Sequence, residues 1–257
     1  ATLPWRGGIT EPLSEDGAQA SPTALIIVYR SVYLAGDTAP ITALAAALAQ
    51  RGLTPVALFV SSLKDPEAIA VVEAAIDRER PAVILNTTAF SAQRNEGGSV
   101  LDRADCPVLQ VILAGAPRAA WDESPRGLGA ADFAMNVALT EIDGRLTTTA
   151  ISFKAEAPAN PALEFAVVRH APDPAQIALV ADRAAGWARL ARTPPADRRI
   201  AVIVADYPSR GGRTGYAVGL DTGRSAANVL TWLAAAGYAA DDTIPAEAIL
   251  PRLEAGT

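Results

Sequence analysis

Four short apolar runs, spaced along the first half of the chain, constrain its fold most. The runs are Thr23–Tyr29, Val56–Val60, Ala82–Thr87 and Val108–Leu113. Runs of this length without polar alternation are typical of strands that are buried on both faces of a parallel sheet. Helical segments of about 10 to 15 residues between such strands imply right-handed crossovers. The sequence therefore predicts an α/β fold, with a Rossmann-like or flavodoxin-like parallel sheet and flanking helices.

The spacing of apolar residues predicts three helices around this sheet. Residues 41–50 have apolar side chains at helical intervals and stop at Gly52, while Pro66 opens a second helix that continues to about residue 80. The longest predicted helix, at 174–192, carries one apolar face and ends before Pro194. Proline cannot continue a helix, so this pattern sets an end as well as a length.

Three segments are expected in the chain. Residues 1–22 are rich in glycine, proline and small polar residues and predict an extended lead-in, and residues 23–193 form the Rossmann-like domain. After a proline-rich link, residues 198–257 begin with an apolar strand and predict the start of a second α/β module. One strand cannot make an independent sheet, and the chain starts without methionine, so we expect a fragment of a larger protein.

Composition excludes several classes of function. The net charge of −6 and pI near 4.9 argue against nucleic-acid binding. No apolar run reaches the about 18 residues of a membrane span, and residues 1–17 lack the features of a signal peptide, which predicts a cytoplasmic protein. With one cysteine, Cys106, and one histidine, His170, the chain has no internal disulfide and no Cys/His metal cage. We expect a packing role for Cys106 and a loop position for His170.

Charged residues that suggest chemistry concentrate between residues 124 and 154. Arg126, Glu141, Asp143, Arg145 and Lys154 lie here among glycines, after a stretch with helical spacing. One interpretation is the wall of a binding site at the turn 141–144. The other is an ordinary Asp-Gly turn, in which Gly144 adopts a positive φ and Asp143 bonds its own backbone.

Two other loops carry candidate ligand-binding residues. Asp37 follows the first predicted strand, at the sheet edge where open α/β sheets place ligands, although either Asp37 or Thr38 can also cap the next helix. Arg210 and Arg213 lie among glycines in the loop 206–216, where guanidinium groups can hold carboxylates or phosphates. This loop is either an anion-binding edge or a plain flexible loop, and it lacks the Gly-Lys-Ser/Thr of a Walker A motif.

Several ordered motifs resemble those of one family, over about residues 23–240. They are Tyr-Arg-Ser-x-Tyr-Leu-Ala-Gly-Asp-Thr-Ala-Pro at 29–40, Pro-Arg-Gly-Leu at 125–128, Ala-Leu-Thr-Glu-Ile-Asp-Gly at 138–144, Asp-Tyr-Pro at 206–208 and Arg-Thr-Gly-Tyr-Ala-Val-Gly-Leu-Asp at 213–221. The chain is similar here to the large subunit of cobaltochelatase, the CobN family, and to its relative, the H subunit of magnesium chelatase. It departs at Thr140, where the family commonly has proline, which predicts a looser turn.

The resemblance implies a part in ATP-dependent insertion of Co²⁺ into hydrogenobyrinic acid a,c-diamide during aerobic cobalamin biosynthesis. The large subunit would hold this corrinoid, and separate AAA+ subunits would hydrolyse ATP with Mg²⁺. ATPase motifs are lacking in this chain, so we expect the fragment to bind no cofactor and to be inactive alone. A competing hypothesis is a non-catalytic α/β domain that binds a small ligand or serves as a scaffold.

Site residues follow from the chemistry that the resemblance implies. Chelation requires a base that accepts pyrrole protons, and Glu141 and Asp143 are the predicted catalytic residues. The substrate carries many carboxylates, which arginine binds in bidentate fashion. The predicted substrate-binding residues are Arg126, Arg210, Arg213 and Asp37. No metal-binding residue is predicted.

Overall fold

The computed structural model describes residues 4–5, 21–94, 97–156, 166–205 and 214–256. The chain divides into two compact units, Ala1–Ala191 and Arg192–Thr257.

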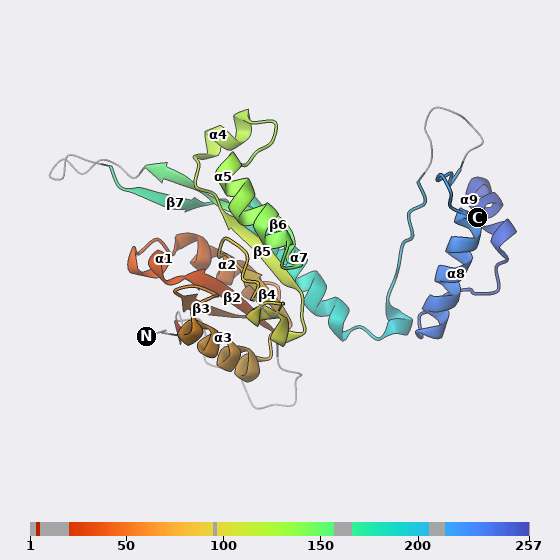
Figure 1. Cartoon of the computed structure of the whole chain (residues 1–257), viewed down its shortest axis with the longest axis horizontal. Helices are drawn as coiled ribbons and strands as arrows, with labels where there is room; N and C mark the ends of the chain where they lie inside the picture. Colours follow the sequence, from red (N-terminus) through yellow and green to blue (C-terminus); the bar gives the residue numbers. More distant parts are fainter. Residues whose placement is uncertain (1–3, 6–20, 95–96, 157–165, 206–213, 257) are drawn as a thin grey trace. The chain divides into compact units, whose positions relative to one another are not determined.

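A seven-stranded sheet forms the centre of the first unit (Figure 1). Its spatial order is β1-β3-β2-β4-β5-β6-β7; the strands β2 to β6 are parallel, and β1 and β7 are antiparallel at the two edges. The bounds are β1 Pro4–Trp5, β2 Thr23–Tyr29, β3 Thr54–Val60, β4 Val83–Asn86, β5 Val108–Leu113, β6 Leu146–Glu156 and β7 Val168–Pro172.

The order of the parallel strands identifies the topology. Counted from β2 along the chain, they lie in the order 2-1-3-4-5, which is the flavodoxin-like arrangement. Leu25 of β2 pairs with Val56 of β3 on one side and with Ile84 of β4 on the other. Both faces of β2 are covered, which explains its unbroken apolar run. The predicted α/β parallel sheet is confirmed, in its flavodoxin-like form.

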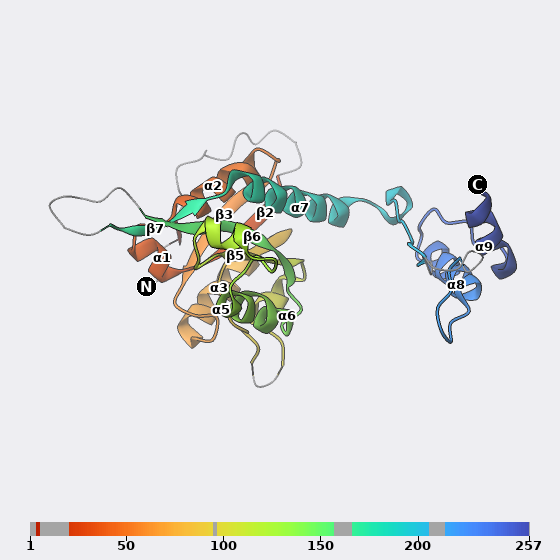
Figure 2. The same ribbon diagram turned by 90° about the horizontal axis from the view of Figure 1, so that it is seen from above.

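Helices cover both faces of the sheet (Figure 2). One face packs against α2 and α7, and the other against α3 and the 3₁₀ turn η1. The bounds are α1 Arg30–Leu34, α2 Ala39–Ala49, α3 Pro66–Glu79, η1 Val100–Ala104, α4 Arg118–Glu123, α5 Ala130–Phe133, the π-helical turn η2 Ala134–Ala138, α6 Leu139–Glu141 and α7 Pro174–Arg192. The three helices predicted from apolar spacing are α2, α3 and α7.

Local chemistry explains where α3 begins and ends. Asp65 accepts a hydrogen bond from the backbone N–H of Glu67 at 3.1 Å, and Pro66 occupies the first turn. Both features favour a helix start. The helix ends at Arg80, whose φ of 42° is left-handed. Its buried residues are Ala68, Val72, Ala75 and Ile76.

Two local predictions are wrong, in whole or in part. His170 lies in β7 and not in a loop, because residues 168–172 pair with 152–156 of β6. Of the two expected caps of α2, Thr38 is the N-cap residue, although without the side-chain hydrogen bond of a cap. Asp37 does not cap the helix, because its carboxylate bonds β7 instead.

The second unit contains the 3₁₀ turn η3 Pro195–Asp197 and the helices α8 Thr222–Ala235 and α9 Ala246–Ala255. Asp221 caps α8 by accepting from the backbone N–H of Arg224 at 2.9 Å. The strand expected after Arg198 is not formed in residues 201–205. Among the described residues of this unit, strand pairing is limited to an isolated bridge between Ala217 and Leu220. Residues 201–205 therefore have no neighbouring strand there to accept or donate backbone hydrogen bonds. That residues 198–257 begin a second α/β module stays a prediction.

A close approach between α8 and α9 gives a test of this packing. Gly223 is buried, and a Cβ atom there would lie 2.6 Å from the carbonyl oxygen of Ala246. We expect Gly223→Ala to destabilise the helix pair by about 1 to 3 kcal/mol, because the two backbones must separate. Amide hydrogen exchange in α8 measures the effect.

The matched control is Gly186 in α7, where an added Cβ meets nothing within 4 Å. Gly186→Ala is expected to stabilise its helix by about 0.5 to 1 kcal/mol, because alanine restricts the unfolded chain. Equal effects of the two substitutions would contradict the close packing of α8 on α9.

No helix in the described part of the chain combines the length and apolar character that crossing a membrane requires.

Candidate functional site

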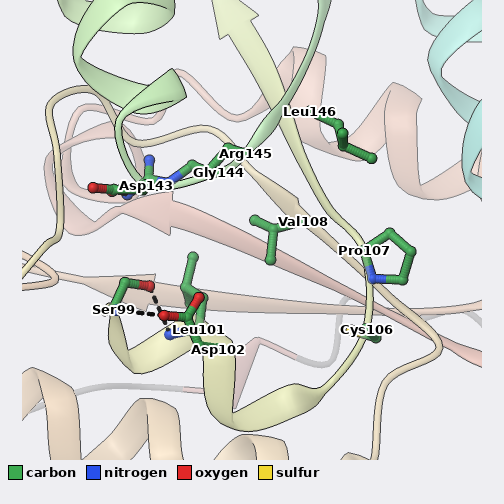
Figure 3. Close-up of a pocket in the computed structure, with 10 residues that line it drawn as sticks. All are labelled: Ser99, Leu101, Asp102, Cys106, Pro107, Val108, Asp143, Gly144, Arg145 and Leu146. Atoms are coloured by element: carbon green, nitrogen blue, oxygen red, sulfur yellow. Dashed lines mark hydrogen bonds and ion pairs between the residues drawn. The ribbon is translucent and has the colours of Figure 1, made fainter. Parts of the chain in front are cut away.

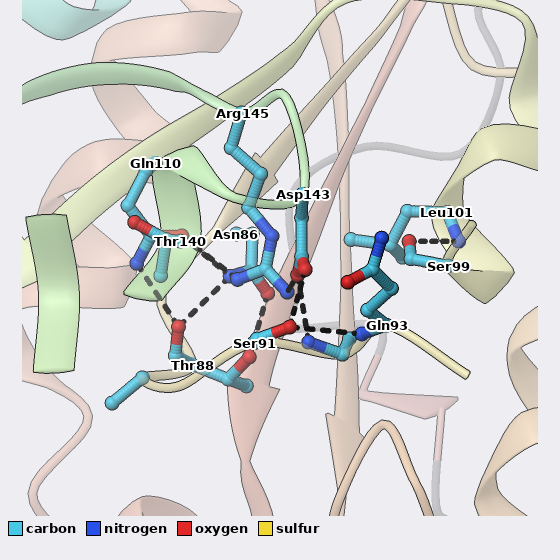
Figure 4. Close-up of polar contacts among 12 residues, drawn as sticks. Asn86, Thr88, Ser91, Gln93, Ser99, Leu101, Gln110, Thr140, Asp143 and Arg145 are labelled. Atoms are coloured by element: carbon cyan, nitrogen blue, oxygen red, sulfur yellow. Dashed lines mark hydrogen bonds and ion pairs between the residues drawn. The ribbon is translucent and has the colours of Figure 1, made fainter. Parts of the chain in front are cut away.

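Buried polar side chains meet where β4 ends beside β5 (Figure 4). Asn86 and Gln110 pair in register and are fully buried. The Asn86 side-chain amide donates to Gln110 Oε1 at 2.8 Å and to the Thr88 carbonyl at 2.9 Å. Gln110 Nε2 also donates to the Thr88 carbonyl, at 3.0 Å, and the Thr88 hydroxyl donates to Asn86 Oδ1. This network fixes the start of the loop that follows β4.

A buried ion pair continues the network toward β6. Arg145 Nη2 lies 2.7 Å from Asp143 Oδ2, and the two side chains are 2% and 0% exposed. Arg145 Nη1 donates to Gln110 Oε1 at 3.1 Å. Burial lowers the pKa of Arg145, and the Asp143 carboxylate opposes this shift. Each charge therefore depends on the other for its stability in the interior.

Asp143 also joins the turn before β6 to the loop after β4. Its carboxylate accepts from the hydroxyl of Ser91 at 2.5 Å and from the backbone N–H of Ala92 at 2.7 Å. The expectation that Asp143 bonds its own backbone is therefore wrong. Its carboxylate oxygens bond residues that lie 51 and 52 positions away in the chain.

The turn itself is held firmly. The backbone N–H of Asp143 donates to the Thr140 carbonyl at 3.1 Å, that of Gly144 donates to the Glu141 carbonyl at 2.9 Å, and Gly144 has the expected positive φ of 70°. The buried Thr140 hydroxyl donates to the carbonyl of Asn136 at 2.7 Å. Threonine at this position anchors the turn to η2, contrary to the looser turn expected from the departure at Thr140.

A cavity of about 240 Å³ opens beside the ion pair (Figure 3). The turn that contains Asp143 and Arg145 forms one wall, and η1 forms another. Ser99, the N-cap residue of η1, makes a capping box with Asp102, in which the Ser99 backbone N–H donates to Asp102 Oδ2 at 2.6 Å. The remaining lining residues are Leu101, Cys106, Pro107, Val108, Gly144 and Leu146.

One nitrogen of the buried Arg145 guanidinium makes no hydrogen bond within the described residues. This nitrogen is Nε, which is itself buried. Nη1 donates to Gln110 and Nη2 to Asp143. A buried donor without an acceptor has lost its hydrogen bond to water, so this Nε–H adds to the cost of burying the Arg145 side chain.

Cys106 lines the same cavity, and burial raises the pKa of its thiol to about 11, from an ordinary 9.0. We expect labelling by an aromatic disulfide at about pH 8 to be about tenfold slower than in the unfolded chain, since the lower thiolate fraction is partly offset by greater nucleophilicity. The folded state holds this proton more tightly, so stability falls as the pH rises from 9.0 toward 11. Equal labelling rates before and after unfolding would contradict this environment.

A second polar cluster links the loop after α1 to the strands β6 and β7. Asp37 Oδ1 accepts from the backbone N–H of His170 at 2.9 Å, and Asp37 Oδ2 lies 3.5 Å from Lys154 Nζ. His170 Nδ1 lies 3.2 Å from the buried Ser152 hydroxyl. Arg169 Nη1 donates to the Gly36 carbonyl at 2.7 Å. Asp37 therefore ties one end of the sheet together.

The pKa of His170 tests this cluster. Burial lowers it below the ordinary 6.5, and the positive charge of Lys154 lowers it further, against the opposing effect of Asp37. We expect an NMR titration midpoint below 6.5, which rises in Lys154→Met. The contribution of His170 to stability is present above pH 6.5 and is lost as the pH falls through the lower folded value. An unchanged midpoint in Lys154→Met would contradict the arrangement.

The predicted site residues lie in different parts of the structure. Glu141 is exposed and its Oε1 accepts from the Thr147 hydroxyl at 3.3 Å, whereas Asp143 is buried. Arg126 is exposed, in the loop after α4. Asp37 belongs to the cluster with His170 and not to the ion-pair network. Arg210 and Arg213 lie outside the described residues. The roles of these residues stay predictions.

The interpretation from sequence placed Arg145 in the charged stretch but gave it no role, and it did not select Asn86 or Gln110 as site residues. The signal for Asn86 and Gln110 was present, because each is an amide side chain within an apolar run. A polar residue in a strand that is buried on both faces requires a partner, and the partner lies on the next strand. In the described residues, no three His, Cys, Asp or Glu side chains gather as a metal site would require.

The strand order and the buried network define a doubly wound, flavodoxin-like domain whose polar residues join the loop after β4 to the turn before β6. The model of the CobN/Magnesium Chelatase family matches residues 3–256, and the chain belongs to this family.

Individual relatives agree with the family. The chain is 42% identical over 229 residues to the aerobic cobaltochelatase subunit CobN of Sinorhizobium sp., and 40% identical over 227 residues to that of Pseudomonas aeruginosa. Each match covers 88% of this chain, and the chain spans 18% of each relative. The catalytic subunit of cobaltochelatase from Mycobacterium tuberculosis has a similar structure, with a TM-score of 0.71 and 28% identity over 92% of this chain and 19% of that one.

Proposed function

We propose that this chain is part of the large, tetrapyrrole-binding subunit of an aerobic cobaltochelatase. The whole enzyme would insert Co²⁺ into hydrogenobyrinic acid a,c-diamide in cobalamin biosynthesis, with AAA+ subunits hydrolysing ATP in the presence of Mg²⁺. The observation that carries the proposal is the 42% identity, over 88% of the chain, to a subunit named for this activity. The chain spans 18% of that relative, so we expect it to be inactive alone.

Within this function, Glu141 is the proposed proton acceptor. Its carboxylate is exposed at the end of α6 and can meet a substrate that approaches from solvent. The oxygens of Asp143 are bonded to Ser91, Ala92 and Arg145 in a closed environment. We therefore assign Asp143 a positioning role, in which it holds the Glu141 turn against the loop after β4, in place of direct proton transfer.

Exposed apolar side chains on the helical segment that ends at Glu141, and on the loop after β4, suit the large flat face of a tetrapyrrole. Ile142 is 59% exposed, Phe133 54% and Phe90 50%. The backbone N–H of Phe90 donates to the Met135 carbonyl at 2.8 Å, which brings the loop after β4 next to η2. Exposed aromatic and aliphatic groups of this size frequently mark a binding surface.

The remaining predicted residues would bind the periphery of the substrate. Arg126 is exposed and available to pair with a carboxylate. Arg210 and Arg213 are proposed for the same purpose, and Asp37 for a polar contact beyond the end of β2. We propose a cytoplasmic location for the assembled enzyme.

Exchange into a relative tests this function in a complete enzyme. This chain would replace the matching segment of the Sinorhizobium cobaltochelatase subunit, which is 42% identical. We expect the chimera to assemble with its ATPase partners and to insert Co²⁺ at a measurable rate. A chimera that folds and assembles but inserts no cobalt would contradict the proposal.

The alternative is that this chain, as a member of the same family, is a non-catalytic domain of the enzyme. The extensive bonding of the Asn86, Gln110, Asp143 and Arg145 side chains is what a non-catalytic ligand-binding or scaffold domain requires. An active chimera that is insensitive to loss of the Glu141 carboxylate would favour this alternative.

A further inference from the structure

The second unit has almost no buried core in its described residues. The helices α8 and α9 pack against each other (Figure 1), and Gly223 is the buried residue of α8. Of the described large apolar side chains of this unit, Ile249 alone is buried, whereas Val218 is 83% and Trp232 67% exposed. A unit with so small a core removes too little apolar surface from water to be stable alone. We therefore expect another part of a protein to cover it.

The apolar segment 200–205 leads into this helix pair. It has the sequence Ile-Ala-Val-Ile-Val-Ala and forms neither helix nor strand. Its backbone N–H and C=O groups make no hydrogen bond to other described residues. Ile203 is 92% and Val202 54% exposed. Unpaired backbone groups beside exposed β-branched side chains are typical of a strand whose neighbours are absent.

One face of the apolar segment already lies against the helices. A Cβ atom at Gly215 would lie 2.9 Å from both Val204 Cγ1 and Leu250 Cδ2, so the Val204 side chain lies beside α9. The next side chain, Ile203, is open to solvent. Successive side chains of a strand point to opposite faces, and this segment has such a pair. The neighbours that it lacks lie in the plane of a sheet.

The unpaired backbone selects the kind of partner. A helix or an apolar ligand could cover the side chains of the apolar segment, but it would leave the backbone N–H groups without acceptors. A neighbouring strand satisfies both. Pairing with a second copy of the segment gives a ribbon of two strands, which is marginal in water. The curated relatives offer a larger source of strands, because this chain spans 18% of each of them.

We propose that residues 200–205 insert as a strand into a parallel β-sheet that the rest of the large subunit forms. Parallel strands are buried on both faces, which suits an unbroken apolar run. The helices α8 and α9 then cover one face of that sheet, through Val204, and Ile203 is buried on the other. The proposal rests on the membership of the chain in the family and not on the activity proposed above.

Amide hydrogen exchange in the isolated chain and in the chimera tests the strand. We expect the amides of residues 201–205 to exchange without protection in the isolated chain, and about 10³-fold more slowly or less in the chimera. If the chimera does not fold, the matching segment of the unmodified Sinorhizobium subunit is measured in its place. Rapid exchange in the complete subunit would overturn the proposal.

Protection in the isolated chain would also overturn it. Protection that rises with protein concentration would assign the apolar segment to a contact between two copies. Protection that is independent of concentration would assign it to a contact within this chain.

Val202→Pro and Val202→Ala separate strand pairing from side-chain burial. Proline removes the backbone N–H, whereas alanine keeps it and shortens the side chain. In the chimera we expect proline to reduce protection of the segment by about 10²-fold and alanine by less than about tenfold. In the isolated chain neither variant is expected to change exchange in α8 by more than about twofold, because this N–H is unpaired there. Equal losses in the chimera would overturn the proposal.

The same chimera separates this inference from the proposed function. Protected amides in a chimera that inserts no cobalt would contradict the proposed function alone. An active chimera with unprotected amides at 201–205 would contradict the strand alone.

Discussion

Asp143→Ala is expected to lower the free energy of unfolding of the first unit by about 3 to 5 kcal/mol. In the unsubstituted chain, the Asp143 carboxylate lies 2.7 Å from the Arg145 guanidinium. The substitution leaves the Arg145 charge buried without this partner. It also removes the acceptor of the Ser91 hydroxyl and the Ala92 backbone N–H. Amide hydrogen exchange in β4 and β5 measures the loss, because these strands adjoin the network.

The exposed pair of Asp77 and Arg103 is the matched control. Its two bonds are 2.8 and 2.7 Å long, but the side chains are 55% and 50% exposed. Asp77→Ala is expected to destabilise the first unit much less than Asp143→Ala does, because solvent screens the charges of the exposed pair. A cost for Asp143→Ala no greater than that of Asp77→Ala would contradict the importance of the buried pair.

Glu141→Gln in the active chimera is expected to lower the rate of Co²⁺ insertion by about 10² to 10⁴. Glutamine keeps the shape of the side chain but cannot accept a pyrrole proton. The exposed position of Glu141 predicts little loss of stability, so the rate is the informative readout. Single-turnover absorption spectra of the corrinoid measure it without a contribution from product release.

Glu123→Gln, another exposed glutamate at the end of α4, controls for a general charge effect. It is expected to leave the rate unchanged within about twofold, because surface charge alone has small effects. Similar rates for both variants would remove Glu141 from the chemistry and support the scaffold alternative.

The sequence predicted the strands β2 to β5 because these strands are largely buried. Thr23–Tyr29 and Val108–Leu113 match β2 and β5 at both ends. The same apolar pattern at residues 201–205 forms no strand, and Ile203 is 92% exposed. A strand requires a neighbour for its backbone hydrogen bonds, and a local pattern does not report whether that neighbour exists.

The charged stretch was visible in the sequence, but the contacts that its residues make were not. The stretch around Glu141 and Asp143 stood out by its charges, whereas the bond between Asp143 and Ser91 spans 52 residues. The contact of Asp37 with His170 spans 133 residues, so capping of the adjacent helix was the simpler expectation. Contacts of this range depend on the strand order, which one sequence does not specify.

We propose that this chain contributes to tetrapyrrole binding, and titration of its tryptophan fluorescence with a carboxylated corrinoid tests this claim. Trp121 packs against Phe153 at a ring distance of 5.4 Å and lies beside Gly127, next to Arg126. We predict saturable quenching that Arg126→Ala weakens by about tenfold, as expected for loss of a charged hydrogen bond. No quenching of a folded sample would contradict the claim.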